Sequence, residues 1–224
     1  MRKKYLFETP LFQFMEKVAD FFIINFFTSL LILPVITAGP ALVACCKVMQ
    51  NFVWKDERPV IAAYFRSFKD NFKQGFVLGL LTLLVLAILA VNLALVYLYF
   101  EGSFAHILYM ILLVAAIVFL GTATYTFSLM ARYNNTLKEH LHNGFFLALG
   151  YLPRTVILLV LCGVPLFLAV YDINIFIKTL IFWLVIGISL IAFGSTKLIA
   201  PVFSALDKRI AEQETNTEEA EESM

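Results

Sequence analysis

Residues 33–46 read LPVITAGPALVACC, and this stretch decides how the N-terminal quarter of the chain folds. It lies inside an apolar region, residues 18–54, that is longer than one membrane crossing needs and is interrupted by Pro34, Gly39 and Pro40. Proline lacks a backbone N–H and glycine tolerates unusual dihedral angles, so these residues favour turns and helix breaks. The stretch is therefore the kink of one crossing helix, the turn of a broken hairpin, or a lipoprotein cleavage site.

The cleavage interpretation rests on Leu42-Val43-Ala44-Cys45, which fits a lipobox. A signal peptide has an apolar region of about 7–15 residues. The apolar run before Cys45 is longer than this and is broken by prolines. We therefore expect the N-terminal segment to be retained, which leaves the hairpin and the kinked crossing.

The composition indicates a membrane protein. Of the 224 residues, 61% are hydrophobic and only 15% are charged, whereas soluble domains carry about 25% charged residues. The net charge of +1 provides no basic field for nucleic acid, so no nucleic-acid partner is expected. The three cysteines and three histidines show no spacing typical of a zinc site. We expect no metal, no cofactor and no catalytic residue, because the motifs of phosphate-binding loops, zinc proteases and serine hydrolases are also missing.

The distribution of apolar residues predicts an all-α fold, a polytopic membrane helical bundle. A crossing helix needs about 20 apolar residues. Four segments meet this requirement, namely 75–100, 104–131, 152–171 and 175–206. Together with the hairpin or fifth span at 18–54, they make residues 1–206 a single membrane domain. Residues 207–224 are acidic and poor in apolar side chains, which predicts a disordered cytoplasmic tail.

Two segments between the spans, 59–74 and 134–150, carry an apolar residue at every fourth position. This spacing gives a helix one apolar stripe, which is typical of amphipathic helices. We interpret both as helices in the inner headgroup layer. Packing of the same stripe against other cytoplasmic segments is the alternative.

The positions of lysine and arginine predict the topology, since basic residues stay on the cytoplasmic side. They gather in the long loops and near the end of the last span, which places the C-terminus in the cytoplasm. Arg2, Lys3 and Lys4 favour a cytoplasmic N-terminus as well. Only a hairpin in residues 18–54 keeps both ends inside, so we prefer it. Five plain crossings, with the N-terminus outside, form the competing topology.

A weak internal repeat runs through the chain. Residues 68–78 read FKDNFKQGFVL and residues 137–147 read LKEHLHNGFFL. Each is preceded by a small-residue turn, Gly39-Pro40-Ala41 in the first case and Gly121-Thr122-Ala123 in the second. We therefore predict structural turns at Pro34, Gly39, Pro40 and Gly121.

The polar residues well inside the predicted spans are mostly uncharged, and Lys178 and Lys197 lie close enough to the membrane surfaces to snorkel. No Asp, Glu or Arg lies near the middle of a span, where such residues mark ion pathways. The candidate intramembrane polar positions are Asn25, Asn92, Thr122, Thr124 and Thr126. Residues of this kind commonly hydrogen-bond between helices. A path for a neutral solute lined by Asn92 and the threonines is the alternative.

Three segments carry a resemblance to a known family: INFFTSLLILPVITAGPALVA at 24–44, YFRSFKDNFKQGF at 64–76 and YTFSLMARYNN at 125–135. They resemble the YesL-like family of bacterial multi-pass membrane proteins, whose molecular activity is uncharacterised. The chain departs from the family in having Phe26-Phe27 where tryptophan often follows the asparagine. The resemblance implies a bacterial cytoplasmic membrane location and an association with genes for carbohydrate uptake and use.

Two functions follow as hypotheses. The first is a non-enzymatic accessory, scaffold or regulator of carbohydrate uptake or sensing, whose partners are the lipid bilayer and a solute-uptake permease or membrane sensor. The second is a small transporter or channel for a neutral solute. The sequence leaves the ligand and the oligomeric state open.

Overall fold

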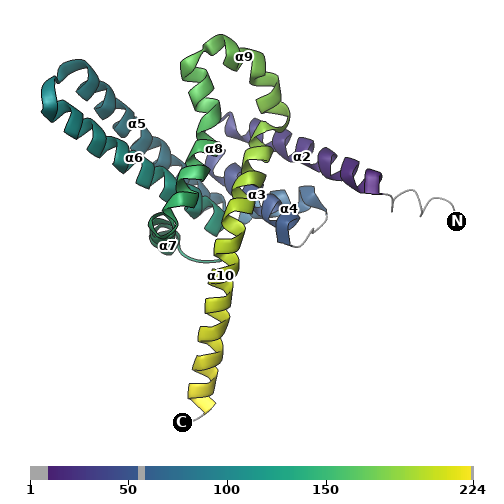
Figure 1. Ribbon diagram of the computed structural model, residues 1–224. Helices are drawn as coiled ribbons and strands as arrows, with labels where there is room; N and C mark the ends of the chain where they lie inside the picture. The colour runs from purple at the N-terminus through teal and green to yellow at the C-terminus, as the bar shows by residue number, and fades with distance from the viewer. Residues whose placement is uncertain (1–9, 55–58, 223–224) are drawn as a thin grey trace.

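The computed structural model describes residues 10–54 and 59–222, and these residues form helices without any strand (Figure 1). The helices are α2 (Pro10–Ile32), α3 (Ala38–Trp54), α4 (Val60–Asp70), α5 (Phe72–Tyr99), α6 (Gly102–Met130), α7 (Leu137–Gly150), α8 (Leu152–Tyr171), α9 (Ile173–Phe182), the π-helical turn η1 (Trp183–Gly187) and α10 (Ile188–Glu222). The predicted all-α class is confirmed. Arg2, Lys3 and Lys4, on which the N-terminal topology depends, lie outside the described residues.

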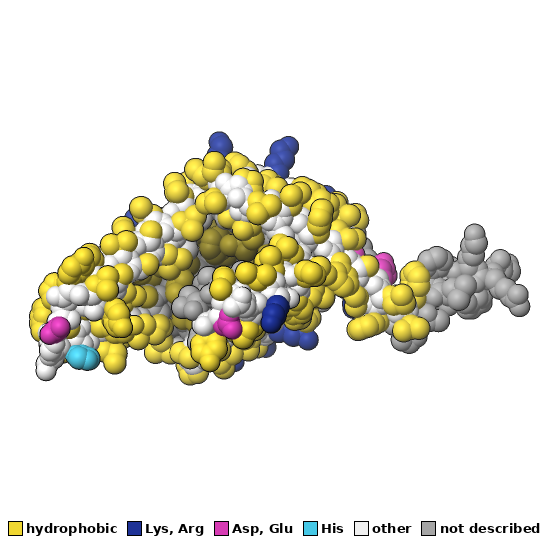
Figure 2. Space-filling view, turned by 90° about the horizontal axis from the view of Figure 1, so that it is seen from above, with side chains coloured by type: hydrophobic (Ala, Val, Ile, Leu, Met, Phe, Trp, Pro, Cys, Tyr) yellow, Lys and Arg dark blue, Asp and Glu magenta, His cyan; other side chains and the backbone are white. Residues whose placement is uncertain are grey.

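Among the described residues, three helical segments are long and apolar enough to cross a membrane: α5, α6 and the stretch Ile173–Glu212, which combines α9, η1 and most of α10. The pair α7 and α8, bent by 105°, passes the same test together and raises the number to four. The predicted spans 75–100 and 104–131 match α5 and α6 closely. Hydrophobic side chains cover most of the face drawn in Figure 2, as expected of helices that contact lipid.

The short helix α3 is the centre of the fold. It packs against α2, α4, α5, α6 and α10. Five of its side chains, from the opening stretch and the turn after it, have no exposed surface: Ala41, Val43, Ala44, Cys45 and Met49. Small residues suit this position because they let several helices approach one axis closely. Figure 1 shows the α5–α6 hairpin leaning to one side of this centre and α10 continuing beyond the other helices.

Residues 18–54 form two helices that pack against each other, as expected of a broken hairpin. The turn between them is held by backbone hydrogen bonds from Val35 N to Ile32 O, at 2.9 Å, and from Ala38 N to Val35 O, at 3.1 Å. Val35 has φ of 60°, a left-handed conformation that is strained for a β-branched residue. Neither α2 nor α3 is among the candidate spans, so the number of crossings in this region stays a prediction.

The predicted turn is only partly correct. Pro34 lies in the turn, but Gly39 and Pro40 lie in the first turn of α3. Proline is tolerated there because the first N–H groups of a helix have no partner within it. Gly121 is also not at a turn, since it lies inside α6. Its role is close packing: an added Cβ would lie 2.5 Å from Thr155 Cγ2 of α8.

Glycine allows α3 and α5 to touch backbone to backbone. A Cβ on Gly75 would lie 2.9 Å from the Cα of Pro40, and one on Gly79 would lie 3.0 Å from the Cα of Gly39. Gly75 and Gly79 thus form the small-xxx-small pattern of close membrane helix pairs. Gly144 of α7 has a corresponding place, since its Cβ would lie 3.0 Å from the carbonyl oxygen of Thr122 in α6. Gly75 and Gly144 occupy the same position in the two sequence repeats. Each packs against the small-residue segment that precedes its repeat, Gly39-Pro40-Ala41 for Gly75 and Gly121-Thr122-Ala123 for Gly144.

The helices predicted at 59–74 and 134–150 occur as α4 and α7. The apolar stripe expected in the first (Tyr64, Phe68, Phe72 and Phe76) shares only Tyr64 with the buried face, and the stripe expected in the second (Leu137, Leu141, Phe145 and Leu149) shares no residue with it. In α4 the buried residues are Val60, Tyr64 and Ser67; in α7 they are His140, Gly144 and Ala148. Both faces pack on the bundle, α4 on α3 and α7 on α6. The first predicted helix also ends early at Asp70, and α5 begins at Phe72 rather than residue 75.

The C-terminal tail differs from its prediction. Instead of a disordered segment beginning at residue 207, α10 continues as a helix to Glu222. The preceding span supplies the first turns, so the unfavourable nucleation step is not needed again. Alanine, glutamate and glutamine, which make up most of residues 211–222, have high helix propensity.

Candidate functional site

Asn25 in α2 joins two distant parts of the bundle. Its side chain is fully buried and donates to the carbonyl oxygens of Leu184 at 2.6 Å and Trp183 at 3.1 Å. Its Oδ1 accepts from the backbone N–H of Ser189 at 2.9 Å. A π-helical turn disrupts the regular hydrogen-bond ladder, and in a membrane a neighbouring helix must satisfy the freed groups. The structure therefore gives Asn25 an interhelical bonding role at η1.

The other predicted polar positions do not gather into one path. Asn92 is exposed on α5 and donates to Ile88 of its own helix, at 2.8 Å. Thr122, Thr124 and Thr126 likewise donate to carbonyls four residues back, at 2.7–2.8 Å. Of these four residues only Thr124 lines the apolar cavity described next, so the structure does not bring Asn92 and the threonines together there.

An apolar cavity of about 310 Å³ lies between α3, α5, α6, α8 and α10. The threonines and Ser128 in its lining donate to carbonyls of their own helices: Thr82 to Leu78, Thr124 to Leu120 and Ser128 to Thr124. The Ser195 hydroxyl lies 3.8 Å from the Cys162 sulfur of α8. Its lining residues include all three cysteines: Leu42, Cys45, Cys46, Thr82, Leu120, Ala123, Thr124, Phe127, Ser128, Cys162, Ile188, Ile191, Ala192 and Ser195. A cavity with this lining favours apolar molecules.

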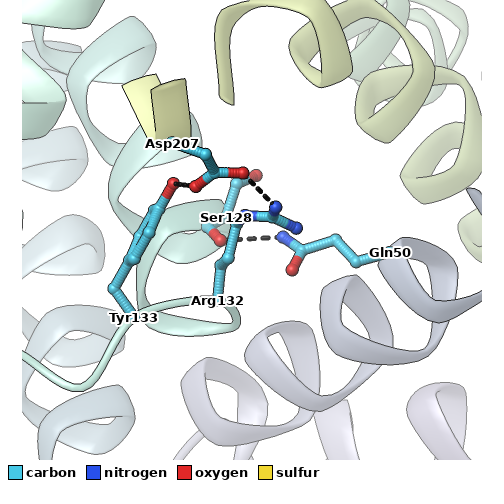
Figure 3. A network of polar contacts seen from close by, with 5 residues as sticks. All are labelled: Gln50, Ser128, Arg132, Tyr133 and Asp207. Carbon is cyan, nitrogen blue, oxygen red and sulfur yellow. Dashed lines mark hydrogen bonds and ion pairs between the residues drawn. The ribbon is translucent and has the colours of Figure 1, made fainter. Parts of the chain in front are cut away.

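A second space of about 300 Å³, here called the polar pocket, is lined by charged, amide and aromatic side chains. It is lined by Lys47, Gln50, Asn51, Trp54, Arg132, Tyr133 and Asp207. These residues come from three places: the second half of α3, the segment after α6, and α10. Figure 3 shows Asp207 and Tyr133 on one side, with Arg132 directed toward the Gln50 side of α3.

Arg132 is held by an ion pair on one side and an aromatic ring on another. Its guanidinium forms an ion pair with Asp207 and lies over the Trp54 ring, 4.3 Å from the ring centroid. Tyr133 donates to the other Asp207 oxygen at 2.6 Å. Burial, followed by the adjacent carboxylate of Asp207, raises the pKa of Tyr133 to about 12, so its phenol stays a donor at neutral pH. The wall of the pocket is therefore fixed in position and charge.

Two buried amide groups in the polar pocket have unused hydrogen-bonding atoms. Gln50, 4% exposed, donates to the carbonyl oxygen of Ser128 at 2.8 Å, which leaves its Oε1 without a partner. Asn51, 6% exposed, has no partner for its Nδ2. A buried polar atom without a partner costs about 1–3 kcal/mol. The two atoms, one acceptor and one donor, have almost no accessible surface and are unsatisfied groups within the packing around α3.

Sequence reasoning missed the polar pocket as a site. Two features of the sequence could have indicated the polar pocket: Arg132 and Tyr133 lie within the family-like segment 125–135, and Asp207 directly follows the last predicted span. Their pairing across 75 positions in the sequence is a tertiary contact that no local pattern indicates. Among the described residues, no group of three or more His, Cys, Asp or Glu is suited to hold a metal ion.

Comparisons with known proteins find similarity to a family and a relative of unknown function. A family described as "Protein of unknown function, DUF624" matches residues 21–93, which include the second half of α2, all of α3 and α4 and most of α5. The chain is also similar to the uncharacterized protein YteU of Bacillus subtilis, with 27% identity over 147 residues. This match covers 65% of each chain, just under two thirds of the relative's length. No solved structure matches.

Proposed function

We propose that this chain is an integral membrane protein of the YesL-like family that acts without catalysis, as an accessory or regulator of carbohydrate uptake or sensing. The similarity to the DUF624 family and to a Bacillus subtilis protein supports the family and a bacterial cytoplasmic membrane. The long apolar helices support the membrane location. The carbohydrate context comes from the family resemblance of the sequence.

The polar pocket is the observation that best supports a regulatory role. Its walls belong to α3, to the segment after α6 and to α10, and these elements are far apart in the chain. A ligand that contacts all three would favour the arrangement in which they are close. A ligand shifts a conformational equilibrium by its difference in affinity for the two states. Binding in the polar pocket would thus be transmitted along α10, which extends well beyond the bundle (Figure 1).

Transport of a neutral solute by this chain alone is supported less well. The apolar cavity offers no free hydroxyl groups at Thr124 and Ser128, because both bond to carbonyls of α6. A sugar entering it would lose hydrogen bonds to water without replacing them, which is costly in an apolar environment. Asn92, a member of the hypothetical path, is exposed on α5.

Co-purification experiments and measurements of solute flux distinguish the accessory function from transport of a neutral solute. A tagged full-length chain, solubilised in mild detergent, is expected to retain a solute-uptake permease or sensor expressed with it from neighbouring genes. Arg132→Ala should weaken this association, whereas Lys178→Ala, at an exposed position on α9, should not. Flux of a sugar into liposomes containing this chain alone would overturn the accessory function in favour of transport.

A further inference from the structure

The apolar cavity has a buried inner end and an accessible side. The side chains of the inner end are buried, and they are Cys45, Ala123, Phe127, Ser128 and Ser195. The other lining residues, such as Leu120 and Cys162, keep part of their surface accessible, and the cavity is partly open to the surface of the molecule. Figure 2 looks down on the α9 end of the molecule and shows a hollow there between hydrophobic side chains. A molecule from outside can therefore enter the cavity.

The apolar cavity lies near the middle of the helices that cross the membrane. Its lining residue Thr82 follows Phe72, the first residue of α5, by ten positions, and Cys162 follows Leu152, the first residue of α8, by ten positions. At a rise of 1.5 Å per residue, both are about 15 Å from the start of their helices. Because the hydrocarbon core is about 30 Å thick, the cavity lies at the depth that the methyl ends of lipid acyl chains reach.

The lining of the apolar cavity offers little to a polar ligand. Thr82 and Thr124 donate to carbonyls of their own helices at 2.7 and 2.8 Å, and Ser128 does the same at 3.1 Å. None of the lining residues, all within the described part of the chain, is charged. A water molecule needs two to four polar partners to stay in a cavity, and a sugar would lose its hydrogen bonds to water. The lining therefore selects a hydrocarbon.

The volume of the apolar cavity excludes a helix of a partner protein. An α-helix with its side chains is 10–12 Å wide, so each residue occupies about 120–170 Å³ of its length. The cavity of about 310 Å³ would hold only about two such residues. An engineered apolar cavity of about 150 Å³ binds benzene, with six carbon atoms. At the same ratio, this cavity holds roughly twelve carbon atoms of a narrow chain.

We propose that the apolar cavity binds the terminal part of one acyl chain of a membrane lipid. The chain enters from the surrounding bilayer, and its methyl end lies against Ala123 and Phe127 at the inner end. The headgroup stays at the membrane surface, outside the cavity. Because α6 forms one wall and α8 and α10 form another, the chain would hold these helices at a fixed spacing. This proposal goes beyond the accessory function and does not depend on it, since it does not involve the polar pocket.

Photo-cross-linking of the full-length chain in lipid nanodiscs tests the proposal. The probe is phosphatidylcholine with a diazirine at the methyl end of one acyl chain. We expect its cross-links, mapped by mass spectrometry, to include Ala123 and Phe127, whose side chains are buried from the bulk lipid around the bundle. The same lipid with the diazirine beside the glycerol should not label these two residues, because they lie near the middle of the membrane.

Two variants fill the apolar cavity from opposite walls. Thr124→Phe in α6 and Cys162→Phe in α8 should each lower the cross-linking of Ala123 about tenfold, because the added ring takes the volume of the chain. Val114→Phe is the matched control on α6, since Val114 is 58% exposed and outside the cavity, and it should leave this cross-linking unchanged. Size-exclusion profiles and melting temperatures show that each variant is folded.

Two results would overturn the acyl-chain proposal. The first is a wild-type chain whose cross-links lie only at exposed positions such as Val114, with none in the apolar cavity, and this result does not depend on any variant. The second is cross-linking of Ala123 that both filling variants leave unchanged. Failure to co-purify a permease, with the cavity still cross-linked, would refute only the proposed function.

Discussion

The carboxamide oxygen of Asn25 accepts a hydrogen bond from the backbone N–H of Ser189 at 2.9 Å, across 164 positions of the chain. The amide nitrogen of the same side chain donates to Leu184 at 2.6 Å. One residue of α2 thus satisfies backbone groups on both sides of Gly187, where the last span is interrupted by η1. Because the surroundings are buried, no water replaces these bonds if the side chain is lost.

Asn25→Leu should therefore destabilise the protein. We expect a loss of about 1–3 kcal/mol, the cost of leaving buried polar groups unpaired, seen as a lower melting temperature in detergent. Asn92→Leu is the matched control, because Asn92 is exposed and bonded only within α5 among the described hydrogen bonds. Equal melting temperatures for the two variants would contradict the role assigned to Asn25.

The contact between α3 and α5 should not tolerate a methyl group. Gly75→Ala places a Cβ 2.9 Å from both the Cα and the N of Pro40, and these are backbone atoms that cannot rotate away. Overpacking of this kind costs about 1–3 kcal/mol. We expect a lower melting temperature and faster proteolysis. Gly163→Ala is the control, since nothing lies within 4 Å of its added Cβ, and it should be neutral or stabilising.

The ion pair of Arg132 and Asp207 should show energetic coupling in a double-mutant cycle. Their side chains are 22% and 38% exposed, so solvent screens part of the attraction. We expect a coupling of about 1 kcal/mol that falls as salt is added. Arg132→Lys should not restore it fully, because lysine lacks the planar group that lies over Trp54. Additive effects of Arg132→Ala and Asp207→Ala would show that the pair is not coupled.

The topology prediction is tested by labelling. In a cysteine-free background, Lys4→Cys should resist a membrane-impermeant maleimide in intact cells and react after the cells are opened, because the hairpin places the N-terminus in the cytoplasm. A cysteine at Glu101, in the connector between α5 and α6, should react in intact cells. Reaction of position 4 in intact cells would instead support five crossings.

Much of the architecture followed from the sequence because the hydrocarbon region of a membrane allows few backbone conformations. Long apolar runs became α5 and α6, since every backbone polar group in the hydrocarbon must bond within its own helix. The break around Pro34 also occurred as predicted, because proline cannot continue the hydrogen-bond ladder. Local chemistry alone decides such features, and they can be seen in a window of about 20 residues.

Tertiary structure decided the rest. Gly39 looked like part of a turn but proved to be the point where α3 meets Gly75 of α5. Asn25 looked like any polar residue in a span, and only the position of η1 gives it partners. The polar pocket needs Gln50, Arg132 and Asp207 together. The sequence by itself determined that the chain forms apolar helices and that one break lies at Pro34; only their packing determined which polar groups meet, because such contacts join residues too far apart for any local pattern to relate them.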